Sequence, residues 1–558
     1  MPSVEGRLLR VHAGATSGPL PAVLLETPGG SEVAVVLPAH ARPLAQALAT
    51  LPAARLAALH LRVFHLLCAT MRAASAGAPA ARQTLRATDA SAVVLEPDLL
   101  LNITDINNAE YCVRQYPIRR MAPSPPTAAS LRGTILHGAF KELLKDGRRD
   151  PNAHLDTAIR ANLTDLALRQ VTLAALREDA EPHLLALAAW YAQEREHLWG
   201  GVPTVRAETF LLAPEVGLKG RLDVLVEDAR GGALLELKTG NVHAQLPKRE
   251  HRWQVHGYQT LLAARRPHDA HRPGATLLYS GTPGQAEGYG LPFHPRELRR
   301  VLELRNQLAF VHATGVVPPP PSANKCGRCT VRHNCLRASR LLGWEPPQID
   351  NGPTPAAVEE DAAWFARYYE LLHLEGRAGE DGLRVLWRLS AQERCAQGVA
   401  LGGLALDGEP RMTARGEWEY AFRCANTSEL REGDEVLLSD GDPARGEVVT
   451  GTILRLTDTG VTVWTPERIA NPTLLDRYAS DIVQTRTVRN LWRWLDVDPH
   501  LRALVAGEQE PVFGPAPDLD DLPARFNAEQ RAAIARALAA EDLLLVQGPP
   551  GTGKTCVV

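Results

Sequence analysis

The sequence lacks the features that mark membrane, secreted and disulfide-rich proteins. Its 558 residues contain no run of 18 or more apolar residues, which argues against a transmembrane helix. The first residues, MPSVEGRLLR, have neither the basic start nor the apolar stretch of a signal peptide. Eight cysteines are far too few for a disulfide scaffold. We therefore expect an intracellular protein without membrane contact, in which clustered cysteines bind metal rather than pair.

A strong imbalance of charge is also missing. The 61 Lys and Arg residues nearly balance the 64 Asp and Glu residues, and the net charge is −3. A nucleic-acid partner would therefore have to bind local basic patches. With 45% hydrophobic and 22% charged residues, the composition is that of an ordinary globular protein. At about 100–200 residues per domain, the length predicts roughly three to five domains.

Hydrophobic periodicity predicts a mixture of strands and helices. Short apolar runs predict strands at Ala22–Leu25 and Val33–Leu37, whereas the Ala- and Leu-rich stretch Leu44–Ala73 predicts a helix. Two runs separated by turn residues predict a strand pair over Gly220–Lys238. Alternation with Gly and Asp turns over residues 430–465 predicts a small β-barrel. The other predicted elements are helices at Leu131–Lys145, His154–Trp199, Gln254–Ala264, 355–375, 473–496 and Phe526–Ala540, and a buried strand at Leu543–Val546.

A glycine-rich loop near the end of the sequence fits the phosphate-loop pattern GxxxxGK[ST] and follows the apolar run LLLV. Its backbone N–H groups would cradle phosphate oxygens, with Lys554 on the β- and γ-phosphates and Thr555 on Mg²⁺. The chain ends three residues after Thr555, without the acidic strand and arginine finger that turnover requires. We therefore expect a fragment or half of a split protein, with an incomplete ATP site. The nucleotide-binding candidates in the loop are Gly548, Pro549, Pro550, Gly551, Thr552, Gly553, Lys554 and Thr555.

Two carboxylates and a lysine form a candidate catalytic group on the predicted strand pair. Glu236 and Lys238 are two residues apart and share a strand face, which Asp223 on the neighbouring strand can reach. Paired carboxylates among apolar residues are costly without a cation, and Mg²⁺ or Mn²⁺ prefers oxygen ligands. A lysine beside the metal can orient or help deprotonate an attacking water, which is the machinery of phosphodiester hydrolysis. The alternative is a solvated hairpin with alternating charges.

Two further motifs flank this group. His137 ends the segment GTILH at the start of a predicted helix, and Gln254 and Tyr258 lie four apart on one helical face. The set G…H, D…ExK and QxxxY resembles the RecB-type branch of the PD-(D/E)XK nucleases. The resemblance implies that His137, Asp223 and Glu236 bind metal, that Lys238 activates water, and that Gln254 and Tyr258 contact DNA.

The cysteines form a second candidate site. Cys326, Cys329 and Cys335 are clustered, and Cys112 lies far upstream. Four thiols suit Zn²⁺ or an iron–sulfur cluster, and a Cys3His zinc knuckle with His333 is the alternative. One cysteine before a nuclease core and three after it resembles the iron–sulfur RecB-type nucleases, which implies a 4Fe–4S cluster that staples the ends of the domain. Basic residues near both sites are expected to track phosphates: Arg114, Arg119, Arg120, Arg132, Lys141, Lys145, Arg148 and Arg149.

The order of these motifs resembles the Dna-two replication nuclease–helicase family over about residues 93–558. The segments that carry the resemblance are LEPDLLLNITDI, GLKGRLDV, LELKTG, EHRWQVHGY and GPPGTGKT. Gln530, before the phosphate loop, resembles the adenine-reading Gln of superfamily 1 helicases. The implied fold is a multidomain α/β protein: a PD-(D/E)XK nuclease core with a 4Fe–4S staple, a small β-barrel and the start of a RecA-like domain. The expected domains are an OB-like or mixed module (1–90), the nuclease (91–345), a helical connector (346–425), the barrel (426–470), a stalk and acidic linker (471–524) and the ATPase start (525–558).

The resemblance implies a metal-dependent nuclease for single-stranded or flapped DNA in replication and repair, with ATP and a 4Fe–4S cluster as further cofactors. A single-strand-binding protein is a further candidate partner, and the expected location is the cytoplasm or nucleoid, or the nucleus in a eukaryote. Two alternatives are a helicase or ATPase fragment whose nuclease-like domain only binds DNA, and a non-enzymatic zinc or iron–sulfur module.

Overall fold

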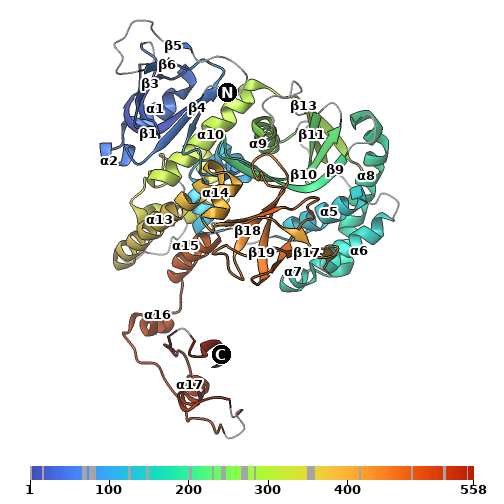
Figure 1. The fold of residues 1–558 in the computed structure, drawn as a ribbon, viewed down its shortest axis with the longest axis vertical. Helices are drawn as coiled ribbons and strands as arrows, with labels where there is room; N and C mark the ends of the chain where they lie inside the picture. The colour runs from blue at the N-terminus through green and yellow to red at the C-terminus, as the bar shows by residue number, and fades with distance from the viewer. Residues whose placement is uncertain are drawn as a thin grey trace.

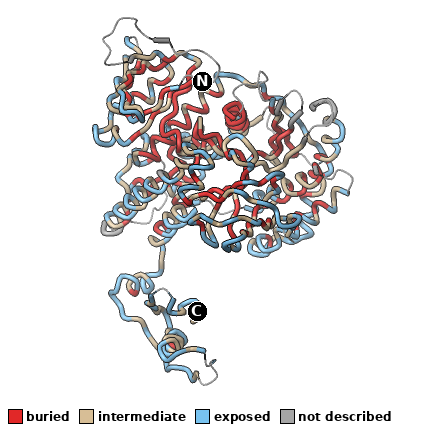
Figure 2. The backbone as a smooth tube through the Cα atoms, viewed as in Figure 1, coloured by how far each residue is buried: buried red, intermediate tan, exposed pale blue. Residues whose placement is uncertain are grey.

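The computed structural model (Figure 1) has a main body built on three β-sheets, with a C-terminal segment that extends away from it. The residues that it describes are 3–15, 18–65, 72–73, 83–123, 127–145, 150–199, 204–228, 231–240, 247–265, 274–281, 284–348, 359–413, 416–478, 482–519, 523, 525–549 and 551–557. Figure 2 shows buried backbone throughout the body and mostly exposed backbone in the C-terminal segment.

The first sheet, the N-terminal sheet, has the strand order β5-β6-β3-β2-β1-β4-β7. Its strands are β1 (Ser3–His12), β2 (Ala22–Glu26), β3 (Glu32–Val36), β4 (His60–His65), β5 (Arg72–Ala73), β6 (Gln83–Arg86) and β7 (Ser91–Leu95). The 3-10 helix η1 (Ala39–Ala41) and the helices α1 (Arg42–Ala49) and α2 (Ala53–Leu56) follow β3. The two predicted strands are confirmed.

The helix predicted over Leu44–Ala73 is wrong, because α1 ends at Ala49 and β4 begins at His60. Polar and apolar residues alternate along β4, and Leu61 and Val63 are fully buried. β4 also pairs with both β1 and β7. Burial with period two in a central strand therefore outweighs the helical propensity of the Ala- and Leu-rich sequence.

The second sheet, the central sheet, has the order β13-β12-β11-β10-β8, with β9 also on β10. Its strands are β8 (Leu101–Asn102), β9 (Thr204–Ala213), β10 (Leu218–Asp228), β11 (Gly231–Lys238), β12 (Gly274–Tyr279) and β13 (Glu287–Leu291). β10 and β11 form the predicted antiparallel pair, and β11 pairs with β12 in parallel. Apolar residues on its two faces belong to two separate cores, so helices cover both sides of the sheet.

The helices α3 (Ile103–Tyr111), α9 (Arg249–Arg265) and α10 (Pro295–Thr314) contribute to the first core. The helices α5 (Ala128–Lys145), α6 (Pro151–Ala161), α7 (Leu163–Leu168) and α8 (Leu173–Trp199) contribute to the second. The single helix predicted over His154–Trp199 is therefore three helices. Asn162 leaves helical geometry between α6 and α7, and Gln170 adopts φ 54° after α7.

The third sheet, the C-terminal sheet, has the order β14-β21-β18-β19-β20-β17-β15, with β16 also on β17. Its strands are β14 (Ala400–Leu401), β15 (Ala405–Leu406), β16 (Arg411–Met412), β17 (Trp418–Arg423), β18 (Glu435–Ser439), β19 (Val448–Leu456), β20 (Gly460–Thr465) and β21 (Leu474–Arg477). Among the described residues its outer strands do not pair, so the predicted barrel is not closed. Part of the helix predicted over 473–496 is β21, because Leu474 and Leu475 enter the core.

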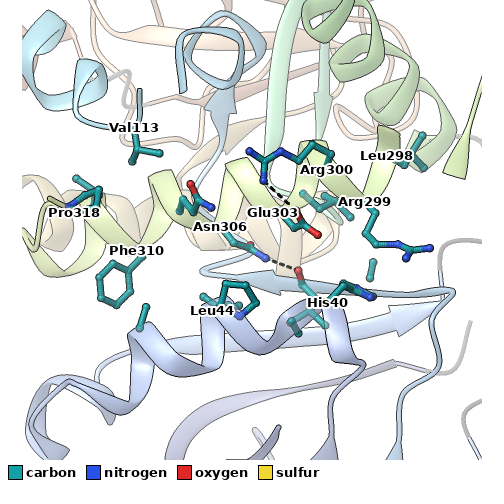
Figure 3. Close-up of a pocket in the computed structure, with 18 of the residues that line it drawn as sticks. His40, Leu44, Val113, Leu298, Arg299, Arg300, Glu303, Asn306, Phe310 and Pro318 are labelled. Atoms are coloured by element: carbon teal, nitrogen blue, oxygen red, sulfur yellow. Dashed lines mark hydrogen bonds and ion pairs between the residues drawn. The ribbon is translucent and has the colours of Figure 1, made fainter. Parts of the chain in front are cut away.

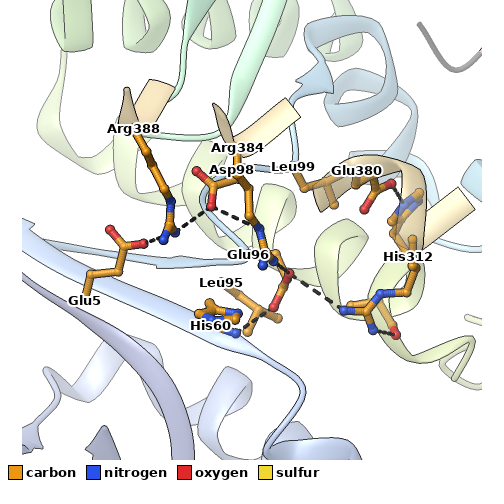
Figure 4. A network of polar contacts seen from close by, with 12 residues as sticks. Glu5, His60, Leu95, Glu96, Asp98, Leu99, His312, Glu380, Arg384 and Arg388 are labelled. Carbon is orange, nitrogen blue, oxygen red and sulfur yellow. Dashed lines mark hydrogen bonds and ion pairs between the residues drawn. The ribbon is translucent and has the colours of Figure 1, made fainter. Parts of the chain in front are cut away.

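Further helices join the three sheets. They are α4 (Gln115–Met121), α11 (Ala323–Gly327), α12 (Arg332–Leu342), α13 (Glu359–Arg388), α14 (Ala391–Ala396) and α15 (Ile482–Trp494). Figure 4 shows how α13 is tied to the N-terminal sheet: Arg388 forms ion pairs with Glu5 and Asp98, and Arg384 with Glu96 and Asp98. Both acids of the β7–β8 connection are buried, so this network fixes α13 across the boundary between the two sheets.

The same boundary holds a cavity of about 740 Å³ between α1 and α10 (Figure 3). Its walls are mainly apolar and include Leu44, Leu298 and Phe310. The cavity lies apart from the predicted catalytic residues, none of which lines it.

The C-terminal segment contains α16 (Pro499–Ala506), α17 (Ala528–Ala539) and α18 (Lys554–Val557). α17 confirms the helix predicted over Phe526–Ala540. The strand predicted at Leu543–Val546 does not form, and Leu545 is 86% exposed. No described strand lies beside this run to bind its backbone groups. In the described part of the chain, no helix is long and apolar enough to cross a membrane.

Candidate functional site

The predicted carboxylates, histidine and lysine converge at one place beside the central sheet. His137 comes from α5, Asp223 from β10, and Glu236 and Lys238 from β11. The antiparallel register, with Val224 opposite Leu235, brings the two acidic strand positions together. The β10–β11 hairpin and one helix therefore bring four groups together, although the first and the last of them, His137 and Lys238, are about 100 residues apart in the sequence.

Asp223 is fixed by contacts at both of its oxygens. Its Oδ1 lies 3.2 Å from Nδ1 of His137, and its Oδ2 accepts a hydrogen bond of 2.8 Å from the backbone N–H of Leu237. Burial opposes the charge of Asp223, but the charges of His137 and Lys238 outweigh it and lower the pKa of the carboxyl. Asp223 is thus an ionised carboxylate held in one orientation.

Glu236 is almost completely buried, at 1% exposure. Its Oε1 accepts hydrogen bonds from Nζ of Lys238 at 2.7 Å and from Nε2 of Gln254 at 2.6 Å. Its Oε2 is buried and accepts no hydrogen bond from any residue that the structure describes. Burial and the nearby charge of Asp223 raise the pKa of Glu236 to about 7. A buried acceptor without a donor is costly, and a bound cation would satisfy it.

The two basic groups of the site are both charged near neutral pH. Burial alone would lower the pKa of His137, but Asp223 and Glu236 raise it to about 9. Burial would likewise lower the pKa of Lys238, and the same two carboxylates raise it instead. The site without a metal ion is therefore a network of paired charges, and a metal would compete with the proton on His137.

Sequence reasoning missed Glu208 on β9. The register on either side, with Leu222 opposite Thr209 and Val224 opposite Ala207, puts Glu208 opposite Asp223. One ligand atom each from His137, Glu208 and Asp223 lies within 4.8 Å of the other two. Burial, then the charge of Asp223, raises the pKa of Glu208. The only available signal was an acidic residue inside an apolar strand run just before the hairpin, RAETFLLA.

Gln254 and Tyr258 of α9 point toward the hairpin. Oε1 of Gln254 accepts a hydrogen bond of 2.9 Å from Lys238, and the Tyr258 hydroxyl donates one of 2.6 Å to the backbone oxygen of Arg221. A side chain at Gly220 would place its Cβ 2.7 Å from the Tyr258 ring, which explains the glycine there. Both residues thus orient β10 and β11, and their contact with DNA stays a prediction.

All four predicted cysteines line one small cavity between α3, α4, α11 and α12. Cys326 and Cys335 are buried, and Cys112 and Cys329 are half-buried. The Gln115 side chain donates from Nε2 to Sγ of Cys329, at 3.6 Å. His333 does not line this cavity. Burial, followed by the neighbouring thiols, raises the pKa of Cys326.

The predicted basic track is only partly available for phosphates. Arg114 is 2% exposed and donates to backbone oxygens of Pro318 and Glu345, and Arg132 pairs with Asp179 at 2.9 Å. Arg148 and Arg149 lie outside the described residues.

The phosphate-loop residues lie together at the start of α18. Nζ of Lys554 contacts the backbone oxygens of Gly548 and Pro549. Gln530 forms a capping box with Asn527, and its Nε2 donates to the backbone oxygen of Thr552 at 3.1 Å. Gly551 and Gly553 have φ 82° and 77°, as such a loop requires. Thr555 lies in α18, and Pro550 is outside the described residues.

Comparisons with known proteins agree with this arrangement. Residues 101–336 match the PD-(D/E)XK nuclease superfamily, and residues 525–558 match an AAA domain. The "DNA replication ATP-dependent helicase/nuclease DNA2" of Xenopus laevis is 25% identical over 562 residues, covering 84% of this chain and 51% of the relative. The Homo sapiens protein of that name is 24% identical, with 84% and 51% covered. The Schizosaccharomyces pombe protein is 22% identical, with 84% and 38% covered.

The chain spans about half the length of the vertebrate relatives that it matches. The crystal structure of SSO0001 is 17% identical and covers 40% of this chain and 92% of that chain, with a TM-score of 0.18, too low to establish a shared fold. The matched domains and the relatives confirm the resemblance predicted from the sequence: over 84% of its length the chain is similar to DNA2-type nuclease–helicases, with a PD-(D/E)XK nuclease match at residues 101–336 and a helicase-like AAA match at residues 525–558.

Proposed function

We propose that this chain hydrolyses phosphodiester bonds in single-stranded or flapped DNA with a bound divalent metal ion. The observation that carries the proposal is a group of three potential metal ligands, His137, Glu208 and Asp223, together with the buried Oε2 of Glu236, which accepts no hydrogen bond from any described residue. Carboxylate oxygens of this kind suit Mg²⁺ or Mn²⁺, and the imidazole favours Mn²⁺. When bound, the ion would polarise the phosphate and lower the pKa of an attacking water.

The protein's own groups prepare the reacting phosphate. Lys238 is held between Glu236 and Gln254, and the carboxylates keep it protonated. Its ammonium therefore orients the attacking water and stabilises the charge that develops on the phosphate, rather than acting as the proton acceptor. Asp223 keeps its position through Leu237, so the charges are fixed before the substrate arrives.

The cysteine cavity is proposed to hold a 4Fe–4S cluster. A tetrahedral zinc ion with Zn–S bonds of about 2.3 Å would draw its sulfurs to within roughly 4 Å of one another. Among the described residues, no three of the cysteine sulfurs lie within 4.8 Å of each other. An iron–sulfur cluster binds its four thiolates at separate iron atoms and suits the wider spacing. Cys112 would then tie α3 to α11 and α12 across the nuclease domain.

We extend the proposal to residues 548–555 as a site for the phosphates of ATP, with Gln530 beside the loop. The contact between Gln530 and Thr552 supports this placement. A role in DNA replication and repair, and contact with a single-strand-binding protein, follow from the names and resemblance of the relatives and are proposed on that ground alone.

The nuclease proposal is tested with end-labelled single-stranded, flapped and duplex DNA, and with RNA of the same sequence. Cleavage is measured with Mn²⁺, with Mg²⁺ and with EDTA. We expect metal-dependent cleavage of unpaired DNA and its loss in Asp223→Asn and Lys238→Ala. Cys424→Ser is the control, because this cysteine packs against the C-terminal sheet. Cleavage by Asp223→Asn at the wild-type rate would reject the site.

A further inference from the structure

The C-terminal sheet packs directly against the strands that carry the catalytic acids. Phe210 and Leu212 of β9 share a core with Leu437, Val448 and Tyr478. Ion pairs accompany this contact: Arg221 with Glu467 at 2.8 Å, Arg206 with Glu447 at 3.0 Å, and Arg445 with Glu215 at 3.8 Å. In Figure 1, β18 and β19 lie below β9 and β10. The C-terminal sheet is therefore one wall of the region around the catalytic site.

Arg221 is distinct among these residues because it lies two positions before Asp223. On strand β10 this spacing puts the Arg221 side chain on the same face as Asp223. Its backbone is held by the Tyr258 hydroxyl, but its side chain is 40% exposed. A fixed backbone with an accessible guanidinium is the arrangement of a residue that can exchange one anionic partner for another.

Building on the nuclease function proposed above, we propose that Arg221 binds a phosphate of the unpaired substrate next to the scissile one, leaving Glu467 when DNA binds. Residues two apart on a strand have Cα atoms about 7 Å apart. That spacing is comparable with the distance between successive phosphates of an extended single strand. A guanidinium group can also donate two parallel hydrogen bonds to two oxygens of one phosphate, and the opposite charges strengthen both bonds.

Glu467 has a defined role in this exchange. Its carboxylate, 12% exposed, holds a negative charge beside the Arg221 guanidinium and would repel an approaching phosphate. The pair with Arg221 neutralises that charge while the site is empty. Because the Arg221 guanidinium is 40% exposed, a phosphate can reach it and displace the carboxylate. Removing Glu467 should therefore strengthen DNA binding, whereas removing Arg221 should weaken it.

The experiment measures binding of a fluorescent oligothymidylate to the full chain by anisotropy over a series of NaCl concentrations. EDTA is present so that no cleavage occurs. Arg221→Gln is expected to weaken binding and to reduce the slope of log K against log[NaCl] by about 0.7, the contribution of one single-strand phosphate contact. Glu467→Gln is expected to keep the slope and tighten binding severalfold. Arg221→Lys should keep the slope, because the charge remains.

Arg445→Gln is the matched control, since it removes one positive charge from the same interface near the β9–β10 turn. Its slope should equal that of the wild type, and thermal melts verify that each variant is folded. The assignment of Arg221 is overturned if Arg221→Gln keeps the wild-type slope, or if the slope of Arg445→Gln falls by the same amount as that of Arg221→Gln. If either result is found and the wild-type chain cleaves DNA, only the assignment of Arg221 is overturned. A wild-type chain that neither binds nor cleaves overturns the nuclease proposal and this one together.

Discussion

Glu208 and Asp223 lie opposite each other on β9 and β10, two carboxylates in one cross-strand pair. Like charges at directly opposed positions destabilise a sheet. Glu208 also has φ 55°, a conformation that costs energy for a residue with a side chain. His137 offsets part of this repulsion. The proposed divalent cation would offset the repulsion within this pair, which costs stability while the cation is absent.

Replacing Glu208 should therefore separate stability from activity. We expect Glu208→Gln to lower nuclease activity at limiting Mn²⁺ by tenfold or more, because one metal ligand loses its charge. The same variant should stabilise the metal-free protein by about 0.2–1 kcal/mol, because the like-charge pair is gone. Cleavage assays and thermal melts in EDTA check the two effects. Glu287→Gln on β13 is the control, and a Glu208→Gln protein that is less stable without metal would contradict this account.

Much of this site was predictable from the sequence, for reasons of spacing. Glu236 and Lys238 share a strand face, and Gln254 and Tyr258 share a helix face, so local periodicity alone fixed their relation. Glu208 was not predictable in that way. Its place depends on how β9 registers against β10, which no local pattern encodes. The same limit explains β4, whose identity as a strand depends on its two neighbours rather than on its own composition.

Metal binding should strengthen as pH rises. In the metal-free protein the pKa of His137 is raised to about 9 and that of Glu236 to about 7, above their unfolded values of 6.5 and 4.5. Both groups keep their protons to higher pH in the folded chain than in the unfolded chain. The contribution of these two groups to the stability of the metal-free protein should therefore fall as pH rises from about 4.5 to 9. Metal ligation needs both groups deprotonated, so the stabilisation by Mn²⁺ should grow over the same range.

Thermal melts at pH 6, 7, 8 and 9, with EDTA or Mn²⁺, measure this difference. His137→Asn should flatten the pH dependence above pH 7, since it removes the group that titrates there. Calorimetry in buffers of different ionisation enthalpy should detect protons released on Mn²⁺ binding. A melting temperature that rises equally with Mn²⁺ at every pH would refute the proton competition.

Loss of Cys112 should affect two distant parts of the nuclease domain. Its sulfur lines the same cavity as Cys326, Cys329 and Cys335, which lie more than 200 residues later. We expect Cys112→Ser to lose bound iron and visible absorption in anaerobically purified protein. Protease cleavage should increase in both α3 and α12, because a cluster ligated from both sides holds them together. Cys424→Ser should keep its iron, and stoichiometric zinc without iron in the wild type would reject the cluster.

The chain also contains a buried ion pair that links α14 to the C-terminal sheet. Nε of Arg394 donates to Oδ1 of Asp476 at 2.6 Å, and the two side chains are 4% and 0% exposed. Arg394 also donates to the backbone oxygen of Leu389, at 2.6 Å. Burial raises the pKa of Asp476, and the charge of Arg394 opposes this rise. Removing one partner leaves a buried charge without compensation, so Arg394→Ala should cost about 3–5 kcal/mol in the free energy of unfolding.

A variant that removes both charges tests whether this cost comes from the stranded carboxylate. Arg394→Met combined with Asp476→Leu should recover most of the loss, because a well-packed apolar pair can replace a buried ion pair with little penalty. The exposed pair Arg423–Asp407, with side chains 72% and 61% exposed, is the control. Arg423→Ala should change the free energy of unfolding by less than about 1 kcal/mol. If the double variant were as unstable as Arg394→Ala, packing or backbone contacts of Arg394, rather than the buried charge of Asp476, would determine the stability of this junction.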